Sequence, residues 1–122
     1  MSKILLIEDE AGIRVAFEAV LRSDDHSVIS LPNGLGLLDA MPGVDLVITD
    51  IMMPHVGGFE VIKLLQMEYD HVPVIVISGG DRFDPAVQNN KIESSWVKAY
   101  LKKPITRKEL LNAVKDVLPP KT

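Results

Sequence analysis

Residues 46–50 have the sequence Leu-Val-Ile-Thr-Asp, a short run of apolar and β-branched residues that ends directly on an acid. Continuous apolar runs of this kind are typical of strands that are buried on both faces of a parallel sheet. Three further runs have the same character, and each of them also ends on polar groups. They are Ile4–Ile7 before Glu8 and Asp9, Val74–Ile77 before Ser78, and Ala99–Lys102 before Lys103 and Pro104. Each run therefore predicts a buried parallel strand with a polar group at its carboxyl end.

Stretches with helical periodicity separate these predicted strands. Residues 11–22 and 59–69 both carry apolar side chains at the spacing of one helix face. Thr106 and Glu109 have the spacing of a capping box, which predicts the start of a last helix that ends before Pro119. The predicted strands are 3–7, 27–30, 45–49, 74–77 and 98–101, and the predicted helices are 11–22, 34–41, 59–69, one that starts near Asp84-Pro85, and the last helix.

Strands that alternate with helices predict right-handed βαβ units and an α/β fold with a central parallel sheet covered on both faces. The length of 122 residues predicts a single domain, 1–122. A net charge of −4 argues against bulk binding to nucleic acid or to an anionic membrane. The chain has no cysteine, which excludes disulfides and thiolate metal sites, and no apolar run long enough to span a membrane. We therefore expect a soluble, cytoplasmic protein.

The acids that follow two of the strands form a candidate cation site. Ligands of open α/β sheets bind at the carboxyl ends of the strands, so we expect Glu8, Asp9 and Asp50 to converge. Three clustered carboxylates repel one another unless a cation binds or one of them takes up a proton. A carboxylate-rich site with only oxygen ligands suits Mg²⁺. The alternative for these acids alone is that Glu8 and Asp9 cap the next helix and Asp50 starts a turn.

The ends of the other two strands favour a functional site over that alternative. Ser78 would add a hydroxyl and Lys103 an ammonium, which are the donors that the oxygens of a phosphorylated carboxylate need. Pro104 allows a cis peptide bond, which would fix the loop that aims Lys103. The five polar groups together predict a site for a divalent cation and a phosphoryl group.

These motifs resemble those of the receiver domain of two-component response regulators, in particular single-domain regulators of the chemotaxis-Y type. The similar motifs are I-L-L-I-E-D-E, L-V-I-T-D-I-M-M-P-H-V-G-G-F-E, V-I-V-I-S-G-G and A-Y-L-K-K-P-I, and the resemblance covers essentially the whole length. It implies a flavodoxin-like, doubly wound five-stranded parallel sheet in the order 2-1-3-4-5, with about five helices.

The resemblance also implies a role for each site residue. The implied roles are Asp50 as phospho-acceptor, Glu8, Asp9, Asp50 and the backbone carbonyl of Met52 as Mg²⁺ ligands, Lys103 as the phosphate-binding lysine, Ser78 as the switch hydroxyl, and Tyr100 as the rotating aromatic residue.

On this resemblance, a histidine kinase or a phosphotransfer protein would donate the phosphoryl group to Asp50 in a Mg²⁺-dependent reaction. Phosphorylation would switch a protein-binding surface on the fourth helix, fifth strand and fifth helix. We expect a phospho-acceptor that catalyses its own phosphorylation and dephosphorylation, and not an enzyme that turns over a substrate. We also expect no direct contact with nucleic acid or membrane, and a monomer or weak homodimer. The segment between Ser78 and Lys103 is longer than is common in the family, which leaves the conformation of 79–97 open.

Other functions fit parts of the pattern. A Mg²⁺-dependent phosphatase of the haloacid dehalogenase type would need a second acid two residues after Asp50, where this chain has Met52. A flavodoxin-like flavin carrier would need a Ser/Thr/Gly-rich loop after the first strand, where this chain has Glu8-Asp9-Glu10. Two alternatives stay open: a receiver fragment of a larger hybrid kinase or DNA-binding regulator, and a receiver-like binding module that is not phosphorylated.

Overall fold

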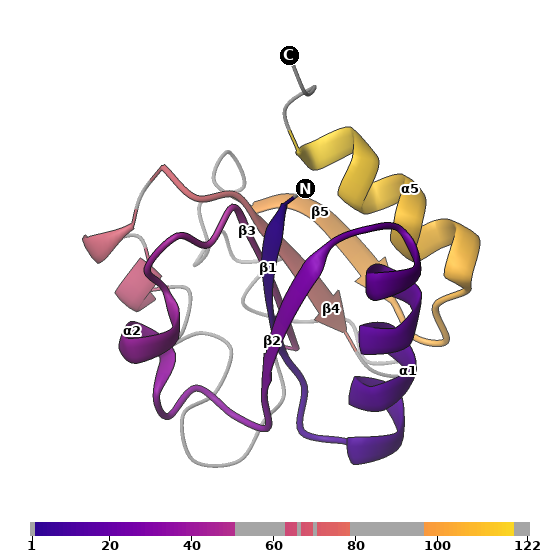
Figure 1. Ribbon diagram of the computed structural model, residues 1–122, viewed down its shortest axis with the longest axis horizontal. Coiled ribbons are helices and arrows are strands. Elements are labelled where there is room, and N and C mark those ends of the chain that lie inside the picture. Colours follow the sequence, from indigo (N-terminus) through magenta and orange to yellow (C-terminus); the bar gives the residue numbers. More distant parts are fainter. Residues whose placement is uncertain (1, 51–62, 66, 70, 79–96, 119–122) are drawn as a thin grey trace.

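The computed structural model describes residues 2–50, 63–65, 67–69, 71–78 and 97–118 (Figure 1). In this part of the chain, five strands form one parallel sheet in the order β2-β1-β3-β4-β5, which confirms the predicted α/β fold and strand order. The strands are β1 (Lys3–Ile7), β2 (Ser27–Leu31), β3 (Leu46–Asp50), β4 (Val74–Ser78) and β5 (Val97–Lys102). The helices are α1 (Ala11–Ser23), α2 (Leu37–Ala40) and α5 (Arg107–Val117), and residues 63–65 and 67–68 are also helical.

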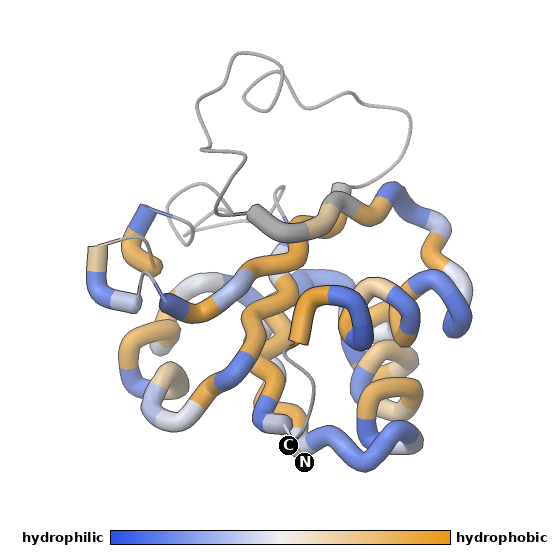
Figure 2. Tube along the Cα trace, turned by 90° about the horizontal axis from the view of Figure 1, so that it is seen from above, coloured by the Kyte–Doolittle hydropathy of each residue, from blue (hydrophilic) through white to orange (hydrophobic). Residues whose placement is uncertain are grey.

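Helices cover both faces of the sheet, and each face has its own apolar core. Figure 1 shows α1 and α5 on one side of the strands, and α2 with the helical residues 63–65 and 67–68 on the other. Successive residues of a strand point to opposite faces. Ile4 of β1 accordingly packs with α1 and α5, whereas its neighbour Leu5 packs with α2 and Leu65. Figure 2 shows the resulting hydrophobic strands in the middle of the molecule.

The predicted bounds of the strands and of α1 agree with the structure to within one residue at each end. The predicted capping box of α5 is present: the hydroxyl of Thr106 accepts a hydrogen bond from the backbone N–H of Glu109 at 3.1 Å, and the Glu109 carboxylate accepts one from the backbone N–H of Thr106 at 3.2 Å. The predicted helix start at residue 59, the helix expected near Asp84, and the loop after Asp50 lie outside the described residues.

The prediction of a helix over residues 34–41 is too long, because α2 is a single turn. Gly36 has a φ of +83°, a left-handed conformation that cannot continue a right-handed helix. Just before it, the side-chain oxygen of Asn33 accepts a hydrogen bond from the backbone N–H of Leu35 at 2.8 Å, so a local turn replaces the expected first turn of helix.

The described helices are short. None of the helices in the described ranges is long and apolar enough to cross a membrane.

Candidate functional site

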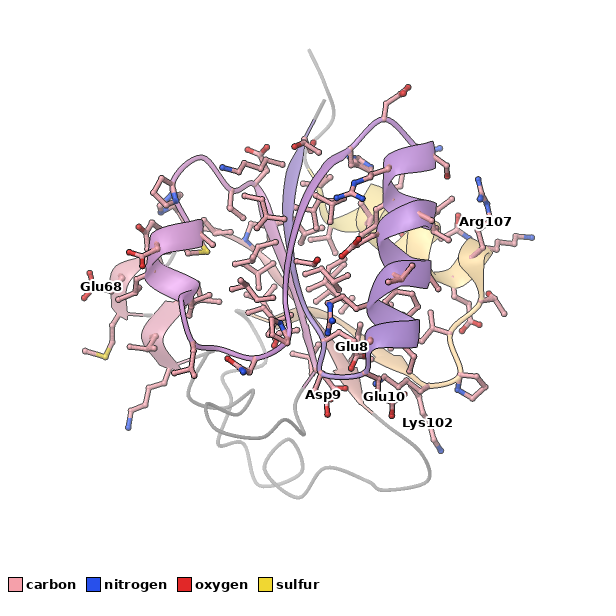
Figure 3. All side chains as sticks on the ribbon, turned by 60° about the horizontal axis from the view of Figure 1, so that its bottom comes forward. Glu8, Asp9, Glu10, Glu68, Lys102 and Arg107 are labelled. Carbon is pink, nitrogen blue, oxygen red and sulfur yellow. The ribbon has the colours of Figure 1, made fainter. Side chains whose placement is uncertain are left out.

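The register of the sheet brings the predicted acids to one edge. Ile7 pairs with Thr49, so the residues that follow them, Glu8 and Asp50, lie at the same level on neighbouring strands. One carboxylate oxygen from each of Glu8, Asp9 and Asp50 lies within 4.8 Å of the other two. Figure 3 shows Glu8 and Asp9 at the turn between β1 and α1. The structure therefore confirms that the three acids converge.

Two of these three acids are buried. Glu8 is 0% exposed and Asp50 is 3% exposed, whereas Asp9 is exposed. Burying an ionised carboxylate costs free energy unless a partner of opposite charge or hydrogen bonds compensate for the lost water. A cationic partner beside the buried pair would provide this compensation.

Lys103 supplies this positive charge. Its Nζ lies 2.6 Å from Oε1 of Glu8 and 2.7 Å from Oδ2 of Asp50, and its side chain is 14% exposed. The loop that carries it follows β5, and the Lys103–Pro104 peptide bond is cis. One ammonium among three carboxylates leaves an excess of negative charge at this edge of the sheet.

This environment shifts the pKa of both partners. Burial raises the pKa of Glu8 to about 7, and the nearby carboxylates of Asp9 and Asp50 act in the same direction, while the hydrogen bond from Lys103 opposes them. Burial also disfavours the charged form of Lys103, but its contacts with Asp50 and Glu8 outweigh this effect, so the pKa of Lys103 is raised. The site thus holds a proton on Glu8 more readily than an exposed glutamate would.

The donor set fits a hard divalent cation. All three acids offer carboxylate oxygens, which Mg²⁺ prefers, and Mg²⁺ commonly binds through one or two carboxylates and keeps several waters. A cation here would share Glu8 and Asp50 with Lys103. The exposure of Asp9 leaves its carboxylate accessible to a hydrated ion.

The other predicted site residues are placed only in part. Ser78 is the last residue of β4, and its backbone pairs with that of Lys102, next to Lys103. Tyr100 lies in β5, and its backbone pairs with that of Val76 in β4. The side chains of Ser78 and Tyr100 lie outside the described part of the structure, as does Met52. Their predicted roles as switch residues and metal ligand stay predictions.

Arg14 also contacts the site, although the sequence did not predict it as a site residue. Its Nη1 donates a hydrogen bond of 2.8 Å to the backbone carbonyl of Glu8, and its side chain is half-buried. A signal for it does exist, because arginine is unfavourable near the positive N-terminal end of a helix unless it has a specific partner. The sequence alone does not show which partner that is.

Comparison with known proteins agrees with this geometry. A family model described as the response regulator receiver domain matches residues 4–115. The sporulation initiation phosphotransferase F of Bacillus subtilis is 27% identical to the chain, and the match covers 98% of this chain and 96% of that protein. The transcriptional regulatory protein FlgR of Helicobacter pylori is 34% identical over 92% of this chain, which spans 28% of the length of FlgR.

Solved structures of similar proteins have the same fold. The chemotaxis response regulator CheY4 of Vibrio cholerae has a TM-score of 0.83 and 26% identity, with 97% of this chain and 99% of CheY4 covered. The response regulator TrrA of Thermotoga maritima, solved in complex with Mg(2+)-BeF, has a TM-score of 0.82 and 26% identity, with 97% and 100% covered. With a family match over most of its length and the same arrangement of strands, this chain belongs to the response regulator receiver domain family.

Proposed function

We propose that this protein is a phospho-accepting receiver of a two-component or phosphorelay system, and that residues 1–122 form one such domain. Asp50 accepts the phosphoryl group from a histidine kinase or a phosphotransfer protein. The observation that carries the proposal is the contact of Lys103 with both Glu8 and Asp50, beside the third acid, Asp9. A nearly buried carboxylate with an ammonium at 2.7 Å and two further acids is suited to phosphoryl transfer.

In the proposed reaction, a carboxylate oxygen of Asp50 attacks the phosphorus of a phosphohistidine. An O–P bond forms, the P–N bond to the donor's imidazole breaks, and the released imidazole nitrogen keeps the electron pair and takes up a proton. Lys103 lies close enough to Asp50 to pair with the oxygens of the transferred group. The product is an acyl phosphate, whose lability suits a signal of limited duration.

The acids supply the second requirement of the reaction, a place for a cation. Glu8, Asp9 and Asp50 would hold Mg²⁺, together with the backbone carbonyl of Met52. When bound, Mg²⁺ neutralises negative charge on the phosphoryl oxygens and so lets an anionic nucleophile approach. The chain itself contributes the orientation of Asp50 at the end of β3 and the exclusion of water from its carboxylate.

The signal would be passed on by docking and not by turnover of a substrate. Ser78 would donate a hydrogen bond to the phosphoryl group, Tyr100 would turn inward, and the surface of the fourth helix, β5 and α5 would bind a protein partner. Self-dephosphorylation would then return the domain to its resting state. We place this activity in the cytoplasm, where a histidine kinase presents its phosphohistidine, and we propose a monomer or a weak homodimer.

One observation favours a second candidate function. Lys103 already compensates Glu8 and Asp50 without a phosphoryl group, which would also suit a receiver-like module that binds partners and is never phosphorylated. The two candidate functions are distinguished by whether Asp50 becomes phosphorylated.

The decisive experiment is the intact mass of the protein after incubation with Mg²⁺ and acetyl phosphate, or with a phosphorylated phosphotransfer domain. We expect one phosphoryl adduct that hydroxylamine removes and that Asp50→Asn abolishes. Asp45→Asn is the matched control, because Asp45 precedes the opposite end of β3 and accepts a hydrogen bond from the backbone N–H of Lys3. Failure of both donors to give an adduct, or an adduct that survives in Asp50→Asn, would refute the proposed function.

A further inference from the structure

We propose that Arg14 is a positioning residue of the acidic site, which holds the peptide group between Glu8 and Asp9 and thereby sets the Asp9 carboxylate for cation binding. The inference rests on the proposed function in so far as it assigns the three acids to a cation. It adds a residue that lies outside the acids and the lysine and acts through the backbone.

The geometry places Arg14 at the point where the chain leaves β1. Its Nη1 donates to the backbone carbonyl of Glu8 at 2.8 Å, and on the other side the backbone N–H of Glu8 donates to the carbonyl of Leu31 in β2 at 3.0 Å. Because a peptide group is planar, a fixed Glu8 carbonyl also fixes the direction in which the chain continues to Asp9. Both backbone groups of Glu8 are therefore held, one by the sheet and one by α1.

Arg14 acts on Asp9 more than on Glu8, because the Glu8 side chain is fixed by other contacts. Oε1 of Glu8 lies against Lys103, and Oε2 accepts a hydrogen bond from the backbone N–H of Glu10 at 3.2 Å. Asp9 is exposed, so its carboxylate is positioned by the backbone that carries it and by its contact with the Glu8 carboxylate. Loss of the Arg14 contact should therefore release Asp9 and leave the pairing of Glu8 with Lys103 in place.

The position of Arg14 along α1 supports a role at the acidic edge. A cation near the N-terminus of a helix is opposed by the helix dipole, and the first turn of α1 contains no acidic residue that would balance it. The negative charge that can balance it lies just before the helix, at the N-cap residue Glu10 and at the acidic site. The guanidinium of Arg14 thus links the start of α1 to the end of β1, which is followed by two of the three acids, Glu8 and Asp9.

The test is the affinity for Mg²⁺ alone, measured by isothermal titration calorimetry on the full chain. We expect Arg14→Met to weaken Mg²⁺ binding by about 10–100-fold, the range typical of residues that orient metal ligands, and Arg14→Lys to recover part of the loss. In phosphorylation by acetyl phosphate, the Mg²⁺ concentration for half-maximal rate should rise by the same factor, while the rate at saturating Mg²⁺ falls much less.

Arg22→Met is the matched control. Arg22 lies on the same helix, and its Nη2 donates to the backbone carbonyl of Val28 at 3.3 Å across an equal sequence separation, but at the opposite end of α1. We expect this variant to bind Mg²⁺ like the wild type. An equal loss in Arg22→Met, or an unchanged affinity in Arg14→Met, would overturn the proposal.

A double-mutant cycle excludes a general loss of structure as the cause. If Arg14 acts through Asp9, then adding Arg14→Met to Asp9→Asn should weaken Mg²⁺ binding little further, whereas additive losses would contradict the inference. If the wild type is phosphorylated but Arg14→Met binds Mg²⁺ as tightly as the wild type, the inference alone is overturned. If Arg14→Met weakens Mg²⁺ binding but the wild type gives no phosphoryl adduct, the proposed function alone is overturned. If the wild type binds no Mg²⁺, both are overturned.

Discussion

At the scale of single residues, Lys103 determines the charge balance of the site. It contacts two acids that are almost fully buried, and each of these would otherwise lack the water that stabilises a free carboxylate. Removing one partner of a buried ion pair is more destabilising than replacing the whole pair with apolar groups. The stability of this edge and its affinity for cations should therefore respond to Lys103 in opposite directions.

Replacing Lys103 with methionine should lower the free energy of unfolding by about 3 kcal/mol in the absence of Mg²⁺, because Glu8 and Asp50 lose their shared cation. The same variant should bind Mg²⁺ at least as tightly as the wild type, since the ion no longer competes with the ammonium. Urea unfolding and calorimetric titration measure the two effects. Lys108→Met is the control, because Lys108 is exposed on α5 and should change the free energy of unfolding by no more than about 0.5 kcal/mol. A Lys103 variant as stable as this control would contradict the expectation.

The raised pKa of Glu8 predicts that the metal-free protein loses stability as the pH rises. The carboxyl titrates at about 7 in the folded protein and near 4.5 in the unfolded chain, so between these values the folded state binds the proton more tightly. The stabilising contribution is complete below the lower value and disappears as the pH passes the upper one. It amounts to about 3 kcal/mol, and Lys103 stays charged throughout this window because its pKa is raised.

Urea unfolding without Mg²⁺ at about pH 5 and about pH 8 brackets the titration of Glu8. We expect the wild type to be less stable at the higher pH, and Glu8→Gln to show a much smaller difference because it has no proton to lose. A difference of equal size in Glu8→Gln would assign the pH dependence to other groups.

The sequence predicts some of these residues better than others. Glu8, Asp50 and Lys103 directly follow apolar runs, and the parallel arrangement of the strands is enough to bring them together. Arg14 could not be assigned in this way, because its contact depends on how α1 returns toward β1. The burial of Glu8 could not be predicted either, because Glu8 follows the strand and the sequence does not show what covers its side chain.

At the scale of the elements, signals within a few residues explain both the successes and the failures of the sequence analysis. The start of α5 was predictable because Thr106 and Glu109 satisfy each other's backbone groups in a local motif. The start of α2 was mispredicted because Asn33 and the left-handed Gly36 form a turn that competes with the first turn of a helix. Apolar spacing alone does not reveal such a competition.

Gly36 and Gly12 give a matched test of this explanation. No other group lies within 4 Å of a Cβ at either position, so only the backbone distinguishes them. Gly36→Ala forces an L-residue to a φ of +83° and should destabilise the protein by about 1 kcal/mol. Gly12→Ala places alanine in the helical conformation of α1 and should stabilise the protein by about 0.5–1 kcal/mol. Thermal unfolding of both variants measures the difference, and destabilisation by both would contradict a purely backbone effect.

At the scale of the whole molecule, the sheet joins the two cores to the site. β1, β3 and β4 contribute alternate side chains to the cores on the two faces. Ile4–Ile7 of β1 and all of β3 are buried, so these strands cannot shift by one residue without exposing apolar side chains. The strand order follows from the alternation of strands and helices together with the resemblance to receiver domains, which is why the fold was predictable over most of the described chain. The acids at the edge are fixed by the same packing.

The site should in turn stabilise the whole fold when a cation binds. The acids come from the turn after β1 and from the end of β3, and these segments separate on unfolding, so Mg²⁺ binds the folded state in preference to the unfolded chain. At a free Mg²⁺ concentration one hundred times the dissociation constant, the free energy of unfolding should rise by about 2.7 kcal/mol. The urea midpoint measured with and without Mg²⁺ gives this increment, and a chelator should reverse it.

Asp9→Asn serves as the comparison, because it removes an exposed ligand and leaves Glu8 and Asp50 paired with Lys103. An equal increase from a monovalent salt of the same ionic strength would show that screening of the acids, and not binding of the ion, stabilises the protein.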